Sequence, residues 1–116
     1  MKEYLMLFRG GDDGFSKQSP EAMQIHMKHW ADWMGAMAEK GKLGSAQPLT
    51  NAGKQVSGIA KTVTDGPFME GKEMVGGYLI CKAENFDEAV EWAKGCPLLE
   101  FEDVNVEVRE INEKMG

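Results

Sequence analysis

The sequence predicts an α+β fold of the ferredoxin-like type, with elements in the order βαββαβ and a β-hairpin inserted after the second strand. Three observations support this prediction. A long amphipathic helix pattern follows the first strand-like run, a shorter helix pattern precedes the last one, and the remaining apolar runs are too short for helices. The length of 116 residues is that of one domain, which we expect to span residues 1–116.

The first strand and the first helix have clear boundaries in the sequence. Tyr4 to Phe8 form an uninterrupted apolar run that suits a strand buried on both faces. After a loop rich in glycine and aspartate, Ser19 can act as the N-cap and Pro20 can occupy the first helical position. We therefore expect a helix from Pro20 to about Lys40, with Gly41 as the left-handed residue that ends it.

This helix carries an apolar stripe with helical spacing, which predicts the face that packs on the sheet. The stripe consists of Met23, Met27, Trp30, Met34, Met37 and Ala38. His26 lies one turn from Met23 and Trp30, and we expect it at the edge of the stripe. His29 points to the side of the helix.

The second half of the chain supplies the remaining elements. They are a strand at Lys42–Leu49, a hairpin at Gln55–Val63, a strand at Met74–Lys82, a helix at Phe86–Lys94 capped by Asn85, and a last strand carrying Val104, Val106, Val108 and Ile111. Cys96-Pro97 predicts a turn between the second helix and the last strand. A sheet of this kind has two helices on one face, so its other apolar face must be covered in some other way.

The composition excludes several classes of protein. The net charge of -6 provides no basic surface for phosphates, so direct nucleic-acid binding is not expected. No apolar stretch approaches the length of a membrane span, so no membrane association is expected. The two cysteines, Cys81 and Cys96, form no disulfide framework, and a reduced cytoplasmic location is the simplest interpretation.

A family resemblance becomes specific in the loop before the third predicted strand. Asp65-Gly66-Pro67-Phe68, followed by Lys72-Glu73 and Gly76-Gly77-Tyr78, resembles the signature of the DGPF branch of the YCII-related proteins. The resemblance extends from Tyr4 to about Ile111. It implies that two chains pair sheet-to-sheet as a dimeric α+β barrel, so a homodimer is expected.

His26 and Asp65 are the candidate catalytic residues. A histidine near the core edge of a helix can act as a general base, and a carboxylate bonded to it would fix its tautomer. The alternatives are a histidine that fills a half-buried position and an Asp-Gly turn. The resemblance implies a functional histidine on the first helix. It also implies an acid before a proline after the second helix, but Cys96 stands there, so Asp65 would have to replace that acid.

Polar residues near strand ends are the candidate ligand-binding residues. They are Arg9, Gln47, Glu73 and Tyr78, together with Gly66, Pro67 and Phe68 of the loop. Arg9 could hold an anionic ligand, although a salt bridge to Glu73 or Glu107 is equally compatible with its position. No metal site and no cofactor are expected, because His26, His29 and Asp32 do not converge on one point around the helix.

Three functional interpretations are compatible with these residues. The first is a small-molecule enzyme of the lyase or isomerase type that uses a His-Asp pair for proton transfer. The second is a non-catalytic ligand-binding or regulatory module, because the resemblance implies an association with extracytoplasmic-function sigma factors. A structural dimer without a ligand is the third alternative.

Overall fold

The computed structural model describes residues 1–10, 17–66 and 74–113. Its main sheet has four antiparallel strands in the order β2-β5-β1-β6. These strands are β1 (Lys2–Arg9), β2 (Leu43–Pro48), β5 (Val75–Ala83) and β6 (Asn105–Glu110). The two central strands are thus the first and third of the sheet, which is the ferredoxin-like arrangement that the element order predicts.

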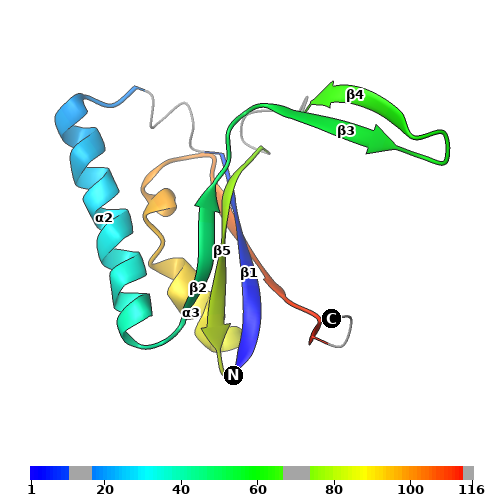
Figure 1. The fold of residues 1–116 in the computed structure, drawn as a ribbon. Helices are drawn as coiled ribbons and strands as arrows, with labels where there is room; N and C mark the ends of the chain where they lie inside the picture. The colour runs from blue at the N-terminus through cyan, green and yellow to red at the C-terminus, as the bar shows by residue number, and fades with distance from the viewer. Residues whose placement is uncertain (11–16, 67–73, 114–116) are drawn as a thin grey trace.

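Two helices cover one face of this sheet, as Figure 1 shows. The helix α2 spans Pro20–Glu39 and α3 spans Phe86–Lys94. Ser19 caps α2 by accepting a hydrogen bond from the backbone N–H of Ala22 at 3.1 Å. Asn85 caps α3 in the same way through the N–H of Glu88 at 2.9 Å. Both predicted caps are confirmed, and Gly41 follows α2 with the predicted positive φ of 70°.

The core lies between the helices and the sheet. Alternate residues of β1 and β5 point toward the helices, because successive side chains of a strand face opposite sides. The buried apolar residues of these elements are Tyr4, Met6 and Phe8 from β1, Leu79, Cys81 and Ala83 from β5, Trp33 and Met37 from α2, and Ala89 and Ala93 from α3. The residues between them on β1 and β5 are only half-buried and form the opposite, outer face.

The buried face of α2 is rotated from the predicted stripe. His26, Trp33 and Met37 are its buried residues, whereas Met27 is exposed. The reason is a segment that the helical pattern cannot reveal: α2 also contacts a 3₁₀ helix, η2 (Pro97–Glu100), which follows α3. His26 therefore lies inside the buried face and not at its edge. The expected turn at Cys96-Pro97 is the start of η2.

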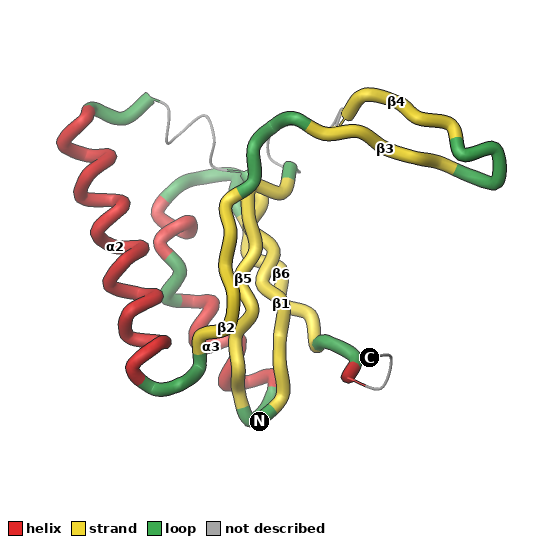
Figure 2. Tube along the Cα trace, in the orientation of Figure 1, coloured by secondary structure: helices red, strands yellow, loops and turns green. Residues whose placement is uncertain are grey.

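The inserted hairpin forms a second, two-stranded sheet. Its strands are β3 (Gly53–Ser57) and β4 (Thr62–Gly66). The hairpin extends away from the main sheet on the side opposite the helices (Figures 1 and 2). No helix within the described residues is both long and apolar enough to cross a membrane.

Candidate functional site: a carboxylate between two histidines

Two elements that are distant in the sequence supply the side chains of the candidate site. His26 and His29 lie on the N-terminal half of α2, and Glu100 is the last residue of η2. Pro97 is suited to the first position of a helical turn because its φ is already helical and its missing N–H is not needed there. The turn that it starts places Glu100 against α2, since α2 and η2 are in contact.

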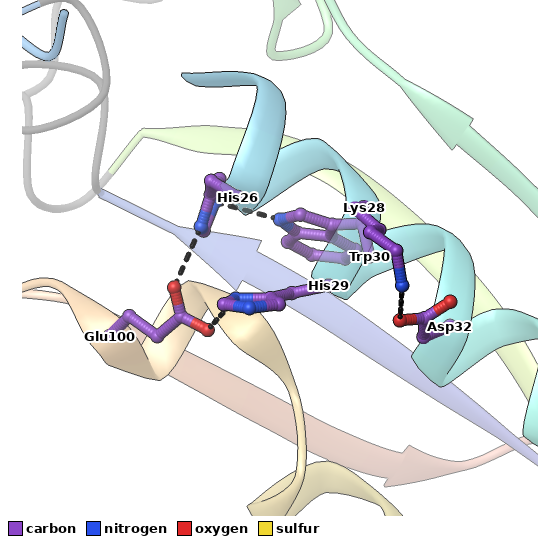
Figure 3. A network of polar contacts seen from close by, with 6 residues as sticks. All are labelled: His26, Lys28, His29, Trp30, Asp32 and Glu100. Carbon is purple, nitrogen blue, oxygen red and sulfur yellow. Dashed lines mark hydrogen bonds and ion pairs between the residues drawn. The ribbon is translucent and has the colours of Figure 1, made fainter. Parts of the chain in front are cut away.

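The carboxylate of Glu100 bridges the two imidazoles. Its Oε1 lies 3.0 Å from Nδ1 of His26, and its Oε2 lies 2.8 Å from Nδ1 of His29. On the far side of the His26 ring, the indole Nε1–H of Trp30 donates to Nε2 at 2.9 Å. Figure 3 shows this chain of contacts from Trp30 through His26 and Glu100 to His29.

Aromatic rings surround His26, which is only 4% exposed. The ring of Phe101 lies 4.7 Å from the His26 ring, centroid to centroid. Trp30 is in turn held edge-on against Phe8 and Trp33, at centroid distances of 5.1 and 5.6 Å. A buried polar ring is costly without hydrogen bonds, and Glu100 and Trp30 provide them at both ring nitrogens.

The donors and acceptors of this network fix the tautomer of His26. An indole N–H can only donate, so Nε2 of His26 must present its lone pair to Trp30. The neutral imidazole then carries its proton on Nδ1 and donates it to Glu100. A second proton on Nε2 would face the Trp30 N–H, donor against donor. Trp30 therefore determines which ring nitrogen of His26 carries the proton.

His29 differs from His26 because its ring is exposed to solvent, while its Nδ1 contacts the same carboxylate. The hydrogen bond from His26, together with that from His29, holds the pKa of the Glu100 carboxyl below its ordinary value against the raising effect of burial. Glu100 is thus ionised and accepts, so Nδ1 of His29 donates to it. The Nε2 lone pair of neutral His29 lies on a ring that is exposed to solvent.

His26, His29 and Glu100 are also residue types that bind metal ions. Within residues 1–10, 17–66 and 74–113, the ligand atoms of His26, His29 and Glu100 lie within 4.8 Å of one another. Coordination through Nδ1 of His26 would require the proton to sit on Nε2, where the donor-only Trp30 N–H lies. The donor set therefore fits a proton-holding network better than a metal centre.

The structure does not bring Asp65 to His26. Asp65 lies on β4 and its carboxylate pairs with Nζ of Lys54 on β3 at 2.6 Å. Figure 1 shows that the hairpin leaves the sheet on the side away from α2. Gly66 ends the same strand. The position that we expected Asp65 to take beside His26 is occupied by Glu100.

The expected ligand-binding residues lie on the other face of the main sheet. Gln47 and Tyr78 are paired across β2 and β5, on the face opposite the core. Arg9 forms an ion pair with Glu107, one of the two partners considered for it. His26 lies on the helix-covered face, so these residues and the histidine do not line one cavity. Pro67, Phe68 and Glu73 lie outside the described residues.

Neither cysteine has the surroundings of a nucleophile. Burial raises the pKa of the Cys96 thiol to about 12 and that of the Cys81 thiol to about 11. The thiolate is the reactive form, so both side chains remain protonated and inert near neutral pH.

Glu100 is the site residue that the sequence analysis missed. It lies 74 residues from His26 in the sequence, and no spacing rule connects the two. One local signal was present: a proline that can begin a helical turn, with an acid at the fourth position of that turn. That signal indicates the turn but not its contact with α2.

Comparison with known proteins gives a match over most of the chain. The family model of the YCII-related domain matches residues 4–113. No curated protein sequence matches the chain. Among solved structures, 5-chloro-2-hydroxyhydroquinone dehydrochlorinase from Burkholderia phenoliruptrix, in complex with 2,5-dihydroxybenzoquinone, is similar at 19% identity, with 98% of each chain covered and a TM-score of 0.45.

Proposed function

The chain belongs to the YCII-related family, and we propose that it is a small-molecule enzyme of the lyase or isomerase type in which a Glu100–His29 pair moves a proton to or from the ligand. The observation that carries this proposal is the single carboxylate that accepts hydrogen bonds from two imidazoles, one buried and one exposed. We also assign the chain to the DGPF branch, on Asp65-Gly66-Pro67-Phe68.

The two histidines have different roles in this proposal. His29 acts as the general base, because its Nδ1–H is held by the carboxylate and its Nε2 lies on the exposed ring. When Nε2 takes a proton, the ionised Glu100 stabilises the imidazolium that forms, as a carboxylate does in other carboxylate–histidine pairs. His26 is a positioning residue: it donates its only proton to Glu100 and keeps the carboxylate facing α2.

The ligand class follows from the chemistry of a neutral imidazole base. Such a base removes protons of moderate acidity, such as a C–H beside a carbonyl or the O–H of a phenol. Small carbonyl acids and phenols are therefore the compounds to test. A role as a regulatory partner of a sigma factor remains a prediction from the family resemblance alone.

Proton exchange in D₂O tests the base without knowledge of the natural substrate. The wild-type protein is incubated with a panel of small carbonyl compounds, and the loss of each α-proton signal is followed by proton NMR. We expect catalysed exchange for at least one compound, with a fall of roughly 100-fold in His29→Gln and Glu100→Gln, in line with the usual size of general-base catalysis. Asp32→Asn is the matched control, because Asp32 pairs with Lys28 on the exposed face of α2.

Two outcomes would contradict the proposed function. If no compound exchanges faster with protein than without it, the protein is not a proton-transfer enzyme for this ligand class. If a compound shifts the NMR signals of the site without exchanging, the protein is the ligand-binding module that we considered as the alternative.

We further propose that the protein forms a homodimer through the outer face of its main sheet. Leu5, Leu7, Tyr78 and Ile80 are half-buried on this face, and they are not part of the core. Charges of both signs surround them, including Glu3, Lys82 and Arg109 on facing strands. A second copy, rotated by a two-fold axis, presents the same apolar centre and can match these charges with their opposites. Sedimentation of the wild type and of Ile80→Glu tests the dimer, which the variant should dissociate.

A further inference from the structure

The two faces of the inserted hairpin differ: one carries polar pairs, and the other carries a valine pair beside an ion pair. In the β3–β4 ladder, Gln55 faces Thr64 and Ser57 faces Thr62, whereas Val56 faces Val63. Neighbouring pairs of a ladder point to opposite sides, so the polar pairs share one face and Val56–Val63 occupies the other. The Lys54–Asp65 ion pair lies on the valine face, beside the valines. The valine pair is therefore the apolar part of this face, and the ion pair lies next to it.

The apolar face of the hairpin is open in the single chain. Val56 is 67% exposed and Val63 is 59% exposed, and Ile59 in the connecting turn is fully exposed. An isolated two-stranded hairpin is at best marginally stable in water. The hairpin nevertheless forms five paired positions, although all residues of its two strands except Gly66 are exposed.

We propose that the hairpin is an arm that packs its Val56–Val63 face on a second copy of this chain. This proposal rests on the homodimer proposed above. The arm leaves the end of β2 on the side of the sheet opposite the helices, which is the side where the second copy would lie (Figures 1 and 2).

The length of the arm fits this occupant. Five residues per strand at about 3.3 Å each give an arm of roughly 17 Å. Two sheets that pack face to face are only about 10 Å apart, so the arm extends past the sheet of the second copy. In this arrangement the valine face contacts the second copy. The polar face, with Gln55 and Thr64, remains exposed to solvent.

Equilibrium sedimentation measures what the arm contributes to association. The double variant Val56→Ser/Val63→Ser should raise the dimer dissociation constant at least tenfold, because each dimer then buries four fewer valines. The matched control, Gln55→Ser/Thr64→Ser, changes the opposite face of the same strands and should leave the constant within about twofold of wild type. If the valine variant has the same dimer dissociation constant as the wild type, the proposed contact between the arm and the second copy is wrong.

A second measurement keeps the test valid if the valine variant unfolds the hairpin. A nitroxide label at Ile59→Cys is accessible, whereas Cys81 and Cys96 are buried. Labelled chains are mixed with unlabelled ¹⁵N chains, and broadening in the unlabelled chains should mark the surface that the arm touches. Absence of broadening in a protein that is dimeric would overturn the arm while leaving the dimer. A monomeric wild type would overturn both, and neither result bears on proton exchange at Glu100 and His29.

Discussion

At the scale of single residues, Trp30 decides what His26 can do. The indole N–H donates to the lone pair of Nε2, so the imidazole carries its proton on Nδ1 and donates it to Glu100. A buried histidine beside a carboxylate would by itself be read as a base. Trp30 is the third member of this network. Because it donates to Nε2 of His26, we assign the role of the base to His29.

Replacement of Trp30 by Phe tests whether the indole N–H fixes the tautomer of His26. Phe removes the donor and keeps an apolar ring in the position of the indole. We expect His26 to change from the single Nδ1–H tautomer to a mixture of the two neutral tautomers. The ¹⁵N shifts of the imidazole nitrogens measure this change. Trp92→Phe serves as the control, because the Trp92 ring lies near Lys40, which caps the end of α2 farther from His26.

An unchanged Nδ1–H tautomer in Trp30→Phe would show that Glu100 alone fixes the His26 tautomer and that the Trp30 donor is not needed for it.

The carboxylate of Glu100 gives a pH dependence of stability. Its pKa in the folded protein is lowered, mainly by the hydrogen bond from His26. The folded state therefore binds fewer protons at this group than the unfolded state. Its contribution to the free energy of unfolding is complete above the ordinary pKa of 4.5 and is lost as the pH falls through the lowered value.

Urea unfolding between pH 6 and pH 3 compares the wild type with Glu100→Gln. We expect the difference in free energy of unfolding to decrease steadily toward the acid end of this range, since Gln does not ionise. Glu102→Gln is a nearby exposed control and should follow the wild type. A difference that is constant over the range would show that the charge of Glu100 does not stabilise the fold.

At the scale of elements, the short helix η2 holds the site together. Leu98 is 7% exposed and belongs to the core, whereas the next residue, Leu99, is 44% exposed. The two leucines therefore provide a matched pair of substitutions within one turn of chain.

Leu98→Ala should lower the free energy of unfolding by about 2–5 kcal/mol, because it leaves a cavity beneath η2. Leu99→Ala should cost less than about 1 kcal/mol. Urea unfolding measures both. In the folded fraction of Leu98→Ala, the His29 ¹⁵N signals should also shift, since Glu100 moves with η2. Equal losses for the two variants would show that η2 is not anchored by Leu98.

The helices and strands could be predicted from the sequence more accurately than the side of each element that is buried. The N-caps at Ser19 and Asn85 and the ends of both helices depend on a few adjacent residues, so local rules suffice. The choice of the buried side of α2 depends on η2, which packs against it from far along the chain. The apolar spacing therefore indicated a helix correctly but put Met27 inside and His26 at the edge.

At the scale of the whole molecule, the main sheet separates two sets of polar residues. His26, His29 and Glu100 lie on the helix side, and Arg9, Gln47 and Tyr78 lie on the outer side. The order of strands could be predicted from the alternation of elements, because few topologies satisfy the packing of two helices on one sheet. The polar side chains that share a face of the sheet could not be predicted in the same way. A shift of the strand register by one residue moves every side chain of the strand to the other face. The partner of His26 was missed for a similar reason, as its contact with Glu100 is long-range and leaves no local pattern.

The separation of 74 residues between His26 and Glu100 also sets the time at which the site can first exist during synthesis. At typical rates of about 5–20 residues per second, the ribosome adds Glu100 roughly 4–15 s after His26. Throughout this interval Glu100, which accepts the hydrogen bond of His26, has not yet been added to the chain. A nascent chain that stops before η2 can form the first helix but not the site, so any activity should appear only in chains that extend past Glu100.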